Sequence, residues 1–186
     1  MVENGLNWTE THRILDQSKK IGADFCFPHQ GTTDKLLDRT TRKIRCMDEV
    51  CRQIRQRGMI PGLSTHMPES PIYADESGLD VETYIQIYNA AGFLMQIEVD
   101  WVHRMIHQRK KPVMTIKPMA AGRLQPLVGL AFVWATLPDI DMVTVGCMTP
   151  DEAKEVIEIS LSILERRGSS VELQRTRSKD SVEPKK

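Results

Sequence analysis

The chain has 186 residues, of which 40% are hydrophobic and 27% charged, a length and composition typical of one globular domain. Its 25 basic side chains balance its 25 acidic ones, and this zero net charge disfavours nucleic acid and anionic membranes as partners. The uncharged stretch at residues 124–138, which no other exceeds in length, is shorter than the about 20 residues that cross a bilayer. No signal-peptide pattern is found at the start of the chain. The cysteines form no CxxC pair, so we expect reduced thiols and a cytoplasmic protein.

Short apolar runs alternate with helical patterns along the chain. A helix is expected over about residues 9–20, and strands are expected at residues 24–28, 59–64, 83–88, 113–116 and 142–145. The runs are uninterrupted rather than alternating, as in strands that are buried on both faces. They recur about every 30 residues, which is the length of a strand with its crossover helix and loops. This pattern predicts an α/β fold with a parallel sheet made of βα repeats.

Apolar residues at helical spacing predict the helices between the strands. One stripe runs through residues 44–54 and ends at Gly58, where a positive φ favours glycine. A second stripe consists of Ile97, Trp101 and Met105, with charged residues on the opposite face.

The last helix has the clearest start signal. Thr149 is expected to cap it, Pro150 to take its first position, and Glu152 to complete a capping box. Its expected buried face consists of Ala153, Val156, Ile157, Ser160, Leu161 and Leu164. After it, residues 168–186 contain almost no large apolar residue, so we expect a disordered C-terminal tail behind a domain at residues 8–167.

Five strands are compatible with two architectures. An open doubly wound sheet would be complete with five, whereas a (β/α)8 barrel needs eight strands and about 250 residues. The spacing of the runs does not choose between them.

The ends of the strands carry a family resemblance. The segments GADFCFPHQ, RGMIPGLSTH, LDVETYIQIYN, KPVMTIKPMAAGRL and DMVTVGCMTPDEAKE resemble, in order, the last five strands of the aldo-keto reductase barrel. The resemblance covers roughly residues 23–165, and the KP-x-A-A-G-R loop is similar to that of an uncharacterised group of such barrels. It implies a partial TIM barrel with five strands and flanking helices.

The resemblance also implies a function. The family reduces carbonyl compounds with NADP(H), and its first three strands supply an Asp, a proton-donating Tyr and a Lys that match no residue here. We therefore expect a fragment with weak or no activity, or a non-catalytic half-barrel. Unpaired strand edges would then favour association with a second copy or another chain.

Polar residues follow the predicted strands, where sites in α/β proteins lie. By resemblance, His29 would orient a substrate carbonyl, Ser64 and Gln86 would bind the nicotinamide, and Asn89 would lie just beyond. His66 is a candidate to act with His29 or to ligate a metal, but no HxH or HExxH spacing supports a metal site. Each of these residues is equally compatible with a structural role in a loop or in a barrel interior.

Two further candidates lie late in the chain. Lys117 ends an apolar strand before Pro118, so it is a candidate for Schiff-base formation in a lyase or isomerase, for phosphate binding, or for no more than solvent contact. The best candidate anion site combines Arg123, Gly146 and the helix start at Thr149, where the helix dipole favours phosphate. Asp151 and Glu152 at that helix start count against an anion.

Overall fold

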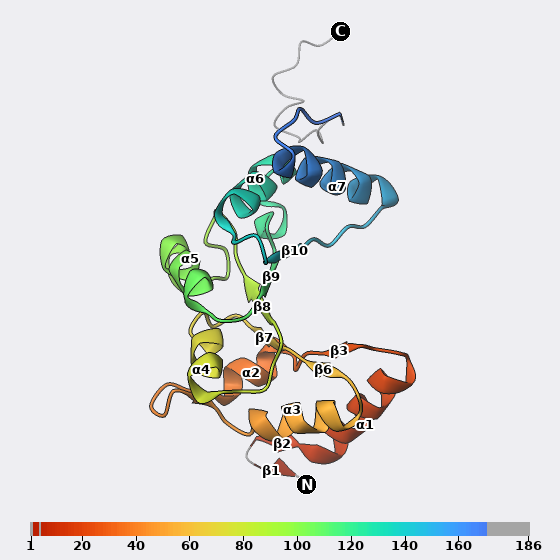
Figure 1. The fold of residues 1–186 in the computed structure, drawn as a ribbon, viewed down its shortest axis with the longest axis vertical. Coiled ribbons are helices and arrows are strands. Elements are labelled where there is room, and N and C mark those ends of the chain that lie inside the picture. The colour runs from red at the N-terminus through yellow and green to blue at the C-terminus, as the bar shows by residue number, and fades with distance from the viewer. Residues whose placement is uncertain (1, 4, 171–186) are drawn as a thin grey trace.

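A computed structural model describes residues 2–3 and 5–170 (Figure 1). Its parallel strands overlap the five predicted runs, and only β7 extends one residue beyond its run: β3 (Phe25–Cys26), β6 (Ile60–Pro61), β7 (Leu63–Thr65), β8 (Tyr84–Ile87), β9 (Val113–Ile116) and β10 (Met142–Thr144). β6 and β7 share one run, which is interrupted at Gly62. β3 pairs with β6, and β7, β8, β9 and β10 pair in chain order, all in parallel. The predicted α/β fold with parallel strands is confirmed.

Helices alternate with these strands. They are α1 (Trp8–Lys20), α2 (Gln30–Leu36), α3 (Met47–Gln56), α4 (Ser70–Ser77), α5 (Val99–Gln108), α6 (Pro126–Thr136) and α7 (Pro150–Leu164), with a 3-10 turn, η1 (Ala120–Gly122). Two short antiparallel pairs, β1 (Val2–Glu3) with β2 (Leu6–Asn7) and β4 (Leu37–Asp38) with β5 (Lys43–Ile44), lie at the N-terminal end. In the described part of the chain, no helix has the length and apolar character needed to cross a membrane.

The predictions for α3 and α5 meet different outcomes. α3 begins at Met47 rather than at Ile44, which lies in β5, and Gly58 has the expected positive φ of 68°. The stripe predicted for residues 97–105 is wrong. α5 buries Val102 and Ile106, while Trp101 is 51% exposed. The helix carries two neighbouring apolar stripes. Its packing against the sheet buries the stripe with Val102 and Ile106, not the stripe that the periodicity predicted.

The predicted start of α7 is confirmed, but its predicted buried face is not. Thr149 caps the helix by accepting a hydrogen bond from the Glu152 N–H at 3.2 Å. The helix buries Glu155, Ile159 and Ser162 instead, and Ile157, Leu161 and Leu164 are exposed. No element of the described residues covers that apolar stripe. The predicted disordered tail falls mostly on residues 171–186, outside the described residues; residues 168–170 form neither helix nor strand.

The two faces of the sheet have different surroundings. Because successive side chains of a strand point to opposite faces, the register places Leu63, Tyr84 and Val113 in one row and Ser64, Ile85, Met114 and Met142 in the other. The first row is fully buried and lies on what we call the covered face. The second row is partly exposed, with Met142 at 39%, and lies on what we call the open face.

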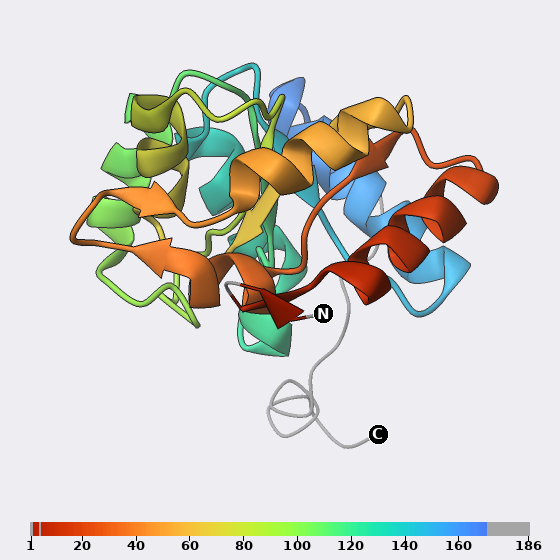
Figure 2. The same cartoon turned by 90° about the horizontal axis from the view of Figure 1, so that it is seen from below.

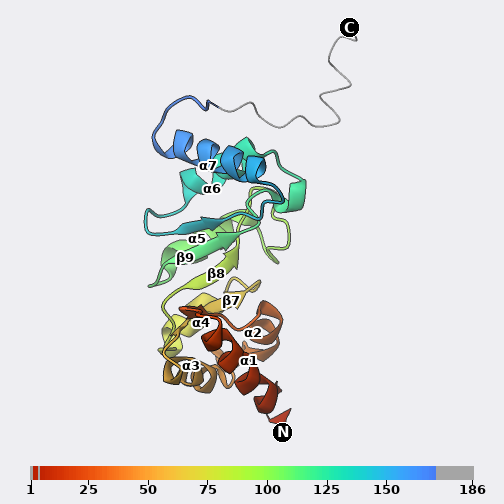
Figure 3. The ribbon, with the colours of Figure 1, turned by 90° about the vertical axis from the view of Figure 1, so that its right-hand side faces the viewer.

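The figures show why the faces differ. α4 and α5 lie on one side of the strands, and the opposite side opens between α1 and α7 (Figure 1). Figure 3 looks at that open side, where no helix lies in front of β7, β8 and β9. Near the β3–β6 pair, α1 packs on α3, as the Arg57–Asp16 ion pair of 2.6 Å shows (Figure 2). Parallel sheets normally have both faces buried. The described residues, by contrast, cover this sheet on one side only.

Candidate functional site

Three candidate residues gather at the carboxyl ends of the strands. His29 caps α2 after β3, His66 follows β7, and Lys117 follows β9. Burial lowers the pKa of His66, the charges of Lys117 and His29 lower it further, and the charge of Asp34 opposes them. His29 and Lys117 therefore each lie within electrostatic range of His66. We call His29, His66 and Lys117 the histidine–lysine cluster.

Asp34 on α2 fixes the position of His66. Its carboxylate accepts hydrogen bonds from the backbone N–H of His66 at 3.2 Å and from Thr65 Oγ1 at 2.5 Å. Thr65 Oγ1 also accepts from the Met67 N–H at 2.9 Å. Asp34 is not among the residues predicted from the sequence, because it lies on a helix beyond the strand end. No local signal marks it, since its partners are more than 30 residues away in sequence.

His29 is held more loosely. Its Nδ1 accepts a hydrogen bond from the Gly31 N–H at 3.1 Å, which leaves the rest of the exposed ring open to solvent. An acceptor at Nδ1 places the proton of the neutral ring on Nε2. His29 can therefore donate a hydrogen bond to an oxygen atom from that side.

The backbone of Lys117 adopts an unusual conformation. Its φ is 58°, and Ala120 and Ala121 in the following turn also have positive φ values of 51° and 56°. Such values cost non-glycine residues about 1 kcal/mol or more each and concentrate at functional sites. Gly129 of α6 permits the close packing of this loop, because a Cβ atom there would lie 2.6 Å from the Pro118 carbonyl oxygen. The described residues form no ion pair with the Lys117 amine.

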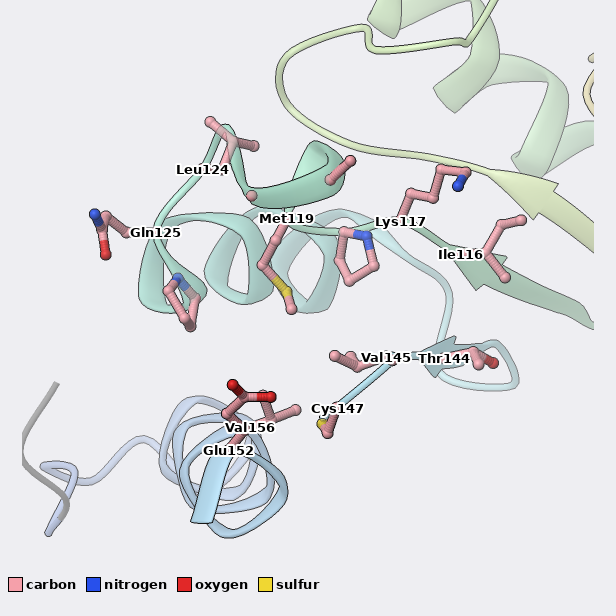
Figure 4. A pocket seen from close by; sticks show the side chains of 15 residues that line it. Ile116, Lys117, Met119, Leu124, Gln125, Thr144, Val145, Cys147, Glu152 and Val156 are labelled. Atoms are coloured by element: carbon pink, nitrogen blue, oxygen red, sulfur yellow. The ribbon is translucent and has the colours of Figure 1, made fainter. Parts of the chain in front are cut away.

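A pocket of about 540 Å3 lies between the ends of β9 and β10 and the start of α7, and we call it the β9–α7 pocket (Figure 4). Most of its lining is apolar, with Met119, Val145 and Val156 among its members. Gly146 and Glu152 also line it. The sequence predicted an anion site here, made of Arg123, Gly146 and the helix start at Thr149.

The predicted anion-binding groups do not converge in this pocket. Arg123 stacks its guanidinium 3.9 Å from the centre of the Phe93 ring and donates to the Ala120 carbonyl at 3.2 Å. Glu152 Oε2 accepts the Met148 N–H at 2.6 Å, so a carboxylate holds one of the backbone donors that a phosphate would need.

The predicted nicotinamide-binding residues lie apart as well. Ser64 is on the open face, but Gln86 is on the covered face, 1% exposed, and its amide has no hydrogen-bond partner in the described residues. Asn89 uses its side chain locally, accepting the Phe93 N–H at 2.9 Å and donating to the Phe93 carbonyl at 3.1 Å. In this arrangement the residues do not fit a nicotinamide dinucleotide.

Within residues 2–3 and 5–170, no group of three or more His, Cys, Asp or Glu side chains is placed to hold a metal ion. The described cysteines are all free, and burial raises the pKa of Cys51 to about 12, which makes that thiol inert. The histidine–lysine cluster and the β9–α7 pocket are therefore the two candidate sites.

Comparisons with known proteins yield no match: no family model, no curated protein and no solved structure is similar to this chain. The fold class and the geometry of the two candidate sites define the molecule as an α/β protein with parallel strands whose polar groups gather at the carboxyl ends of the strands.

Proposed function

We propose that this chain forms five βα units of an aldo-keto-reductase-like barrel, whose ancestral reaction is the NADP(H)-dependent reduction of a carbonyl compound. The observation that carries the proposal is the order of the strands, because β3 pairs with β6, which lies in the run that contains β7, and β7, β8, β9 and β10 pair in chain order. A doubly wound sheet would reverse its order at a switch point, and this sheet does not.

The two ends of the sheet support the same proposal. β3 and β10 each have a strand neighbour on one side only among the described residues. Next to β10, α7 exposes its apolar stripe, and near β3 the side chains of Ile14, Ile21 and Phe25 are exposed. Further βα units that docked on these edges would bury both apolar surfaces and close the open face.

The histidine–lysine cluster supplies a carbonyl-binding site in this proposal. The lowered pKa of His66 favours its neutral ring, which still carries one N–H. His29 can donate from Nε2 because its Nδ1 accepts the Gly31 N–H, so both rings can donate to a carbonyl oxygen. Lys117 adds a positive charge near the same oxygen. Asp34 keeps His66 in place through its backbone bonds.

Reduction itself needs groups that the described residues do not assemble. No residue here matches the family's proton-donating Tyr, and the candidate cofactor residues do not converge. We therefore propose that the chain by itself binds carbonyl compounds without reducing them at ordinary enzyme rates.

An NMR titration tests the carbonyl site. Adding a panel of aldehydes to the chain should shift the ring signals of His29 and His66, while His12 on α1 serves as an internal control. Addition of NADPH should produce no turnover above background. If the ring signals of His29 and His66 do not move, the chain has no carbonyl site there. Turnover of NADPH at ordinary enzyme rates would disprove the proposal that the chain lacks a proton donor for reduction.

A second candidate function rests on Lys117. An amine without an ion-pair partner among the described residues, within electrostatic range of His66, is suited to condense with a carbonyl once it has lost its proton to solvent, and the condensation releases water. This would make the chain a lyase or isomerase of a phosphorylated or other carbonyl substrate. Borohydride, which reduces an imine to a stable secondary amine, should then label Lys117, and labelling that Lys117→Arg leaves unchanged would rule the idea out.

A third candidate is a non-catalytic half-barrel that associates with a second copy through the free edges. The unpaired edges of β3 and β10 and the exposed stripe of α7 favour it. Sedimentation at increasing concentration should reveal a dimer that Leu161→Glu weakens. A chain that remains monomeric up to high concentration would exclude self-association.

A further inference from the structure

The β9–α7 pocket contains a carboxylate that faces its interior. Glu152 lies in the first turn of α7, and Figure 4 shows its carboxylate directed from the helix into the space opposite Met119. Its Oε2 accepts one hydrogen bond, from the Met148 N–H at 2.6 Å. An ionised carboxylate has room for further donors, so Glu152 can still bind a group brought by a ligand.

The nearby cations do not neutralise this carboxylate. Lys117 also lines the pocket, but in Figure 4 its amine points away from Glu152. Arg123 is held on the Phe93 ring. A ligand placed beside Glu152 would therefore meet a negative charge. A phosphate or carboxylate ligand would be repelled, and a cation would be attracted.

The rest of the pocket suits an apolar molecule of moderate size. Its volume of about 540 Å3 falls within the range of roughly 300–1,000 Å3 typical of small-molecule sites. Ile116, Met119, Val145 and Val156 supply apolar surface from β9, the η1 loop, the end of β10 and α7. A ligand of mixed character would bury its hydrocarbon part against these side chains.

We propose that the β9–α7 pocket binds a small organic amine, whose protonated nitrogen pairs with Glu152 and whose apolar part contacts Met119, Val145 and Val156. Glu152 acts as the residue that selects charge: it favours ammonium ligands and excludes phosphorylated ones. The proposal does not rest on the carbonyl site or on reduction.

Three probes with the same six-carbon body test the proposal: hexylamine, hexanol and hexanoate. Chemical shifts of the Met119 and Val156 methyl groups report binding to the folded chain. Hexylamine should bind about fivefold more tightly than hexanol, the value of a partly exposed ion pair, and hexanoate more weakly than both. Equal affinity for hexylamine and hexanol, or displacement of hexylamine by inorganic phosphate at matched ionic strength, would overturn the proposal.

Two variants separate Glu152 from the general charge of the helix start. Glu152→Gln should remove the preference for the amine while it keeps hexanol binding. Asp151→Asn makes the same change of charge one residue earlier, at a side chain that is 90% exposed and outside the pocket lining, so it should keep the preference. If both variants reduce the preference equally, the pocket has no specific amine site. Retained hexanol binding also shows that each variant still folds.

Discussion

The covered and open faces of the sheet use similar residues in different surroundings. On the covered face, Tyr84 is fully buried and donates to Asp75 at 2.6 Å, and Arg109 forms an ion pair with Asp141 under α5. On the open face, Ile85 and Met114 are equally apolar but partly exposed, and no polar network surrounds them. The strands therefore carry apolar residues on both faces. The described residues bury the covered face fully and leave the open face partly exposed.

This difference shows where the energy of the fold is concentrated. Helices α4, α5 and α6 stabilise the sheet from the covered face, where core residues and buried ion pairs coincide. The open face is buried at Ile87 but partly exposed at Ile85 and Met114, so it contributes less than the covered face until it is covered. Substitutions on the two faces should accordingly have unequal effects.

The largest effect is expected at the ion pair that joins α5 to the β9–β10 region. Arg109 donates to Asp141, whose carboxylate also accepts the Val113 N–H at 2.9 Å, and both side chains are almost fully buried. Burial raises the pKa of Asp141 even beside this guanidinium. Arg109→Ala should lower the free energy of unfolding by about 3–5 kcal/mol, because it leaves an unpaired buried carboxylate.

Urea denaturation measures this loss. Arg104→Ala is the control, because Arg104 pairs with Asp100 at 3.5 Å on the surface of the same helix, where both side chains are more than half exposed. Its effect should stay within about 0.5 kcal/mol. Similar losses for the two variants would show that the covered face is not the site of concentrated stability.

A pair of methionines compares the buried core with the open face. Met59 is 1% exposed in the core next to β6, and Met142 is 39% exposed on the open face. Met59→Ala should cost about 2–5 kcal/mol and Met142→Ala less than about 1 kcal/mol, because only the first leaves a cavity. Equal costs in urea denaturation would show that the open face is covered in solution, as it would be in a completed barrel or a dimer.

The sequence predicted the strands well because their positions depend on local composition. The runs VMTI and MVTV appear as β9 and β10, and the capping threonine of α7 is in place. The face of each strand was beyond prediction, because an uninterrupted apolar run such as TYIQIY contains no alternation that would mark Gln86 as inward or outward. Asp34 was missed because its contacts are long-range, and the buried stripe of α5 was missed because only tertiary packing selects it.

A smaller effect is expected where α6 meets the loop after β9. Gly129 lies inside α6, where an alanine would ordinarily stabilise the helix by up to about 1 kcal/mol. Here a Cβ atom would lie 2.6 Å from the Pro118 carbonyl oxygen, so Gly129→Ala should instead cost about 1–3 kcal/mol and displace Lys117. Gly146→Ala, which meets no atom within 4 Å, is the control. A stabilised Gly129→Ala variant would refute the close packing of this loop.

The smallest expected effect is a shift in the titration of His66. Its pKa is lowered from 6.5 mainly by burial, while the charge of Asp34 raises it. Asp34→Asn removes that charge but keeps an oxygen that can accept the Thr65 and His66 hydrogen bonds, so the pKa of His66 should fall further. Because the unfolded chain then binds a proton more readily, the contribution of His66 to stability is complete above pH 6.5 and is lost as the pH falls below it.

An NMR pH titration of the His66 ring measures the shift, and denaturation at pH 7.5 and pH 5 measures the loss. The variant should lose more stability between these pH values than the unchanged chain does. Asp48→Asn on α3 makes the same change of charge away from the cluster and should leave the pKa of His66 unchanged. A His66 pKa that is equal in all three proteins would place Asp34 outside electrostatic range of His66. The histidine–lysine cluster would then lack the carboxylate that the geometry assigns to it.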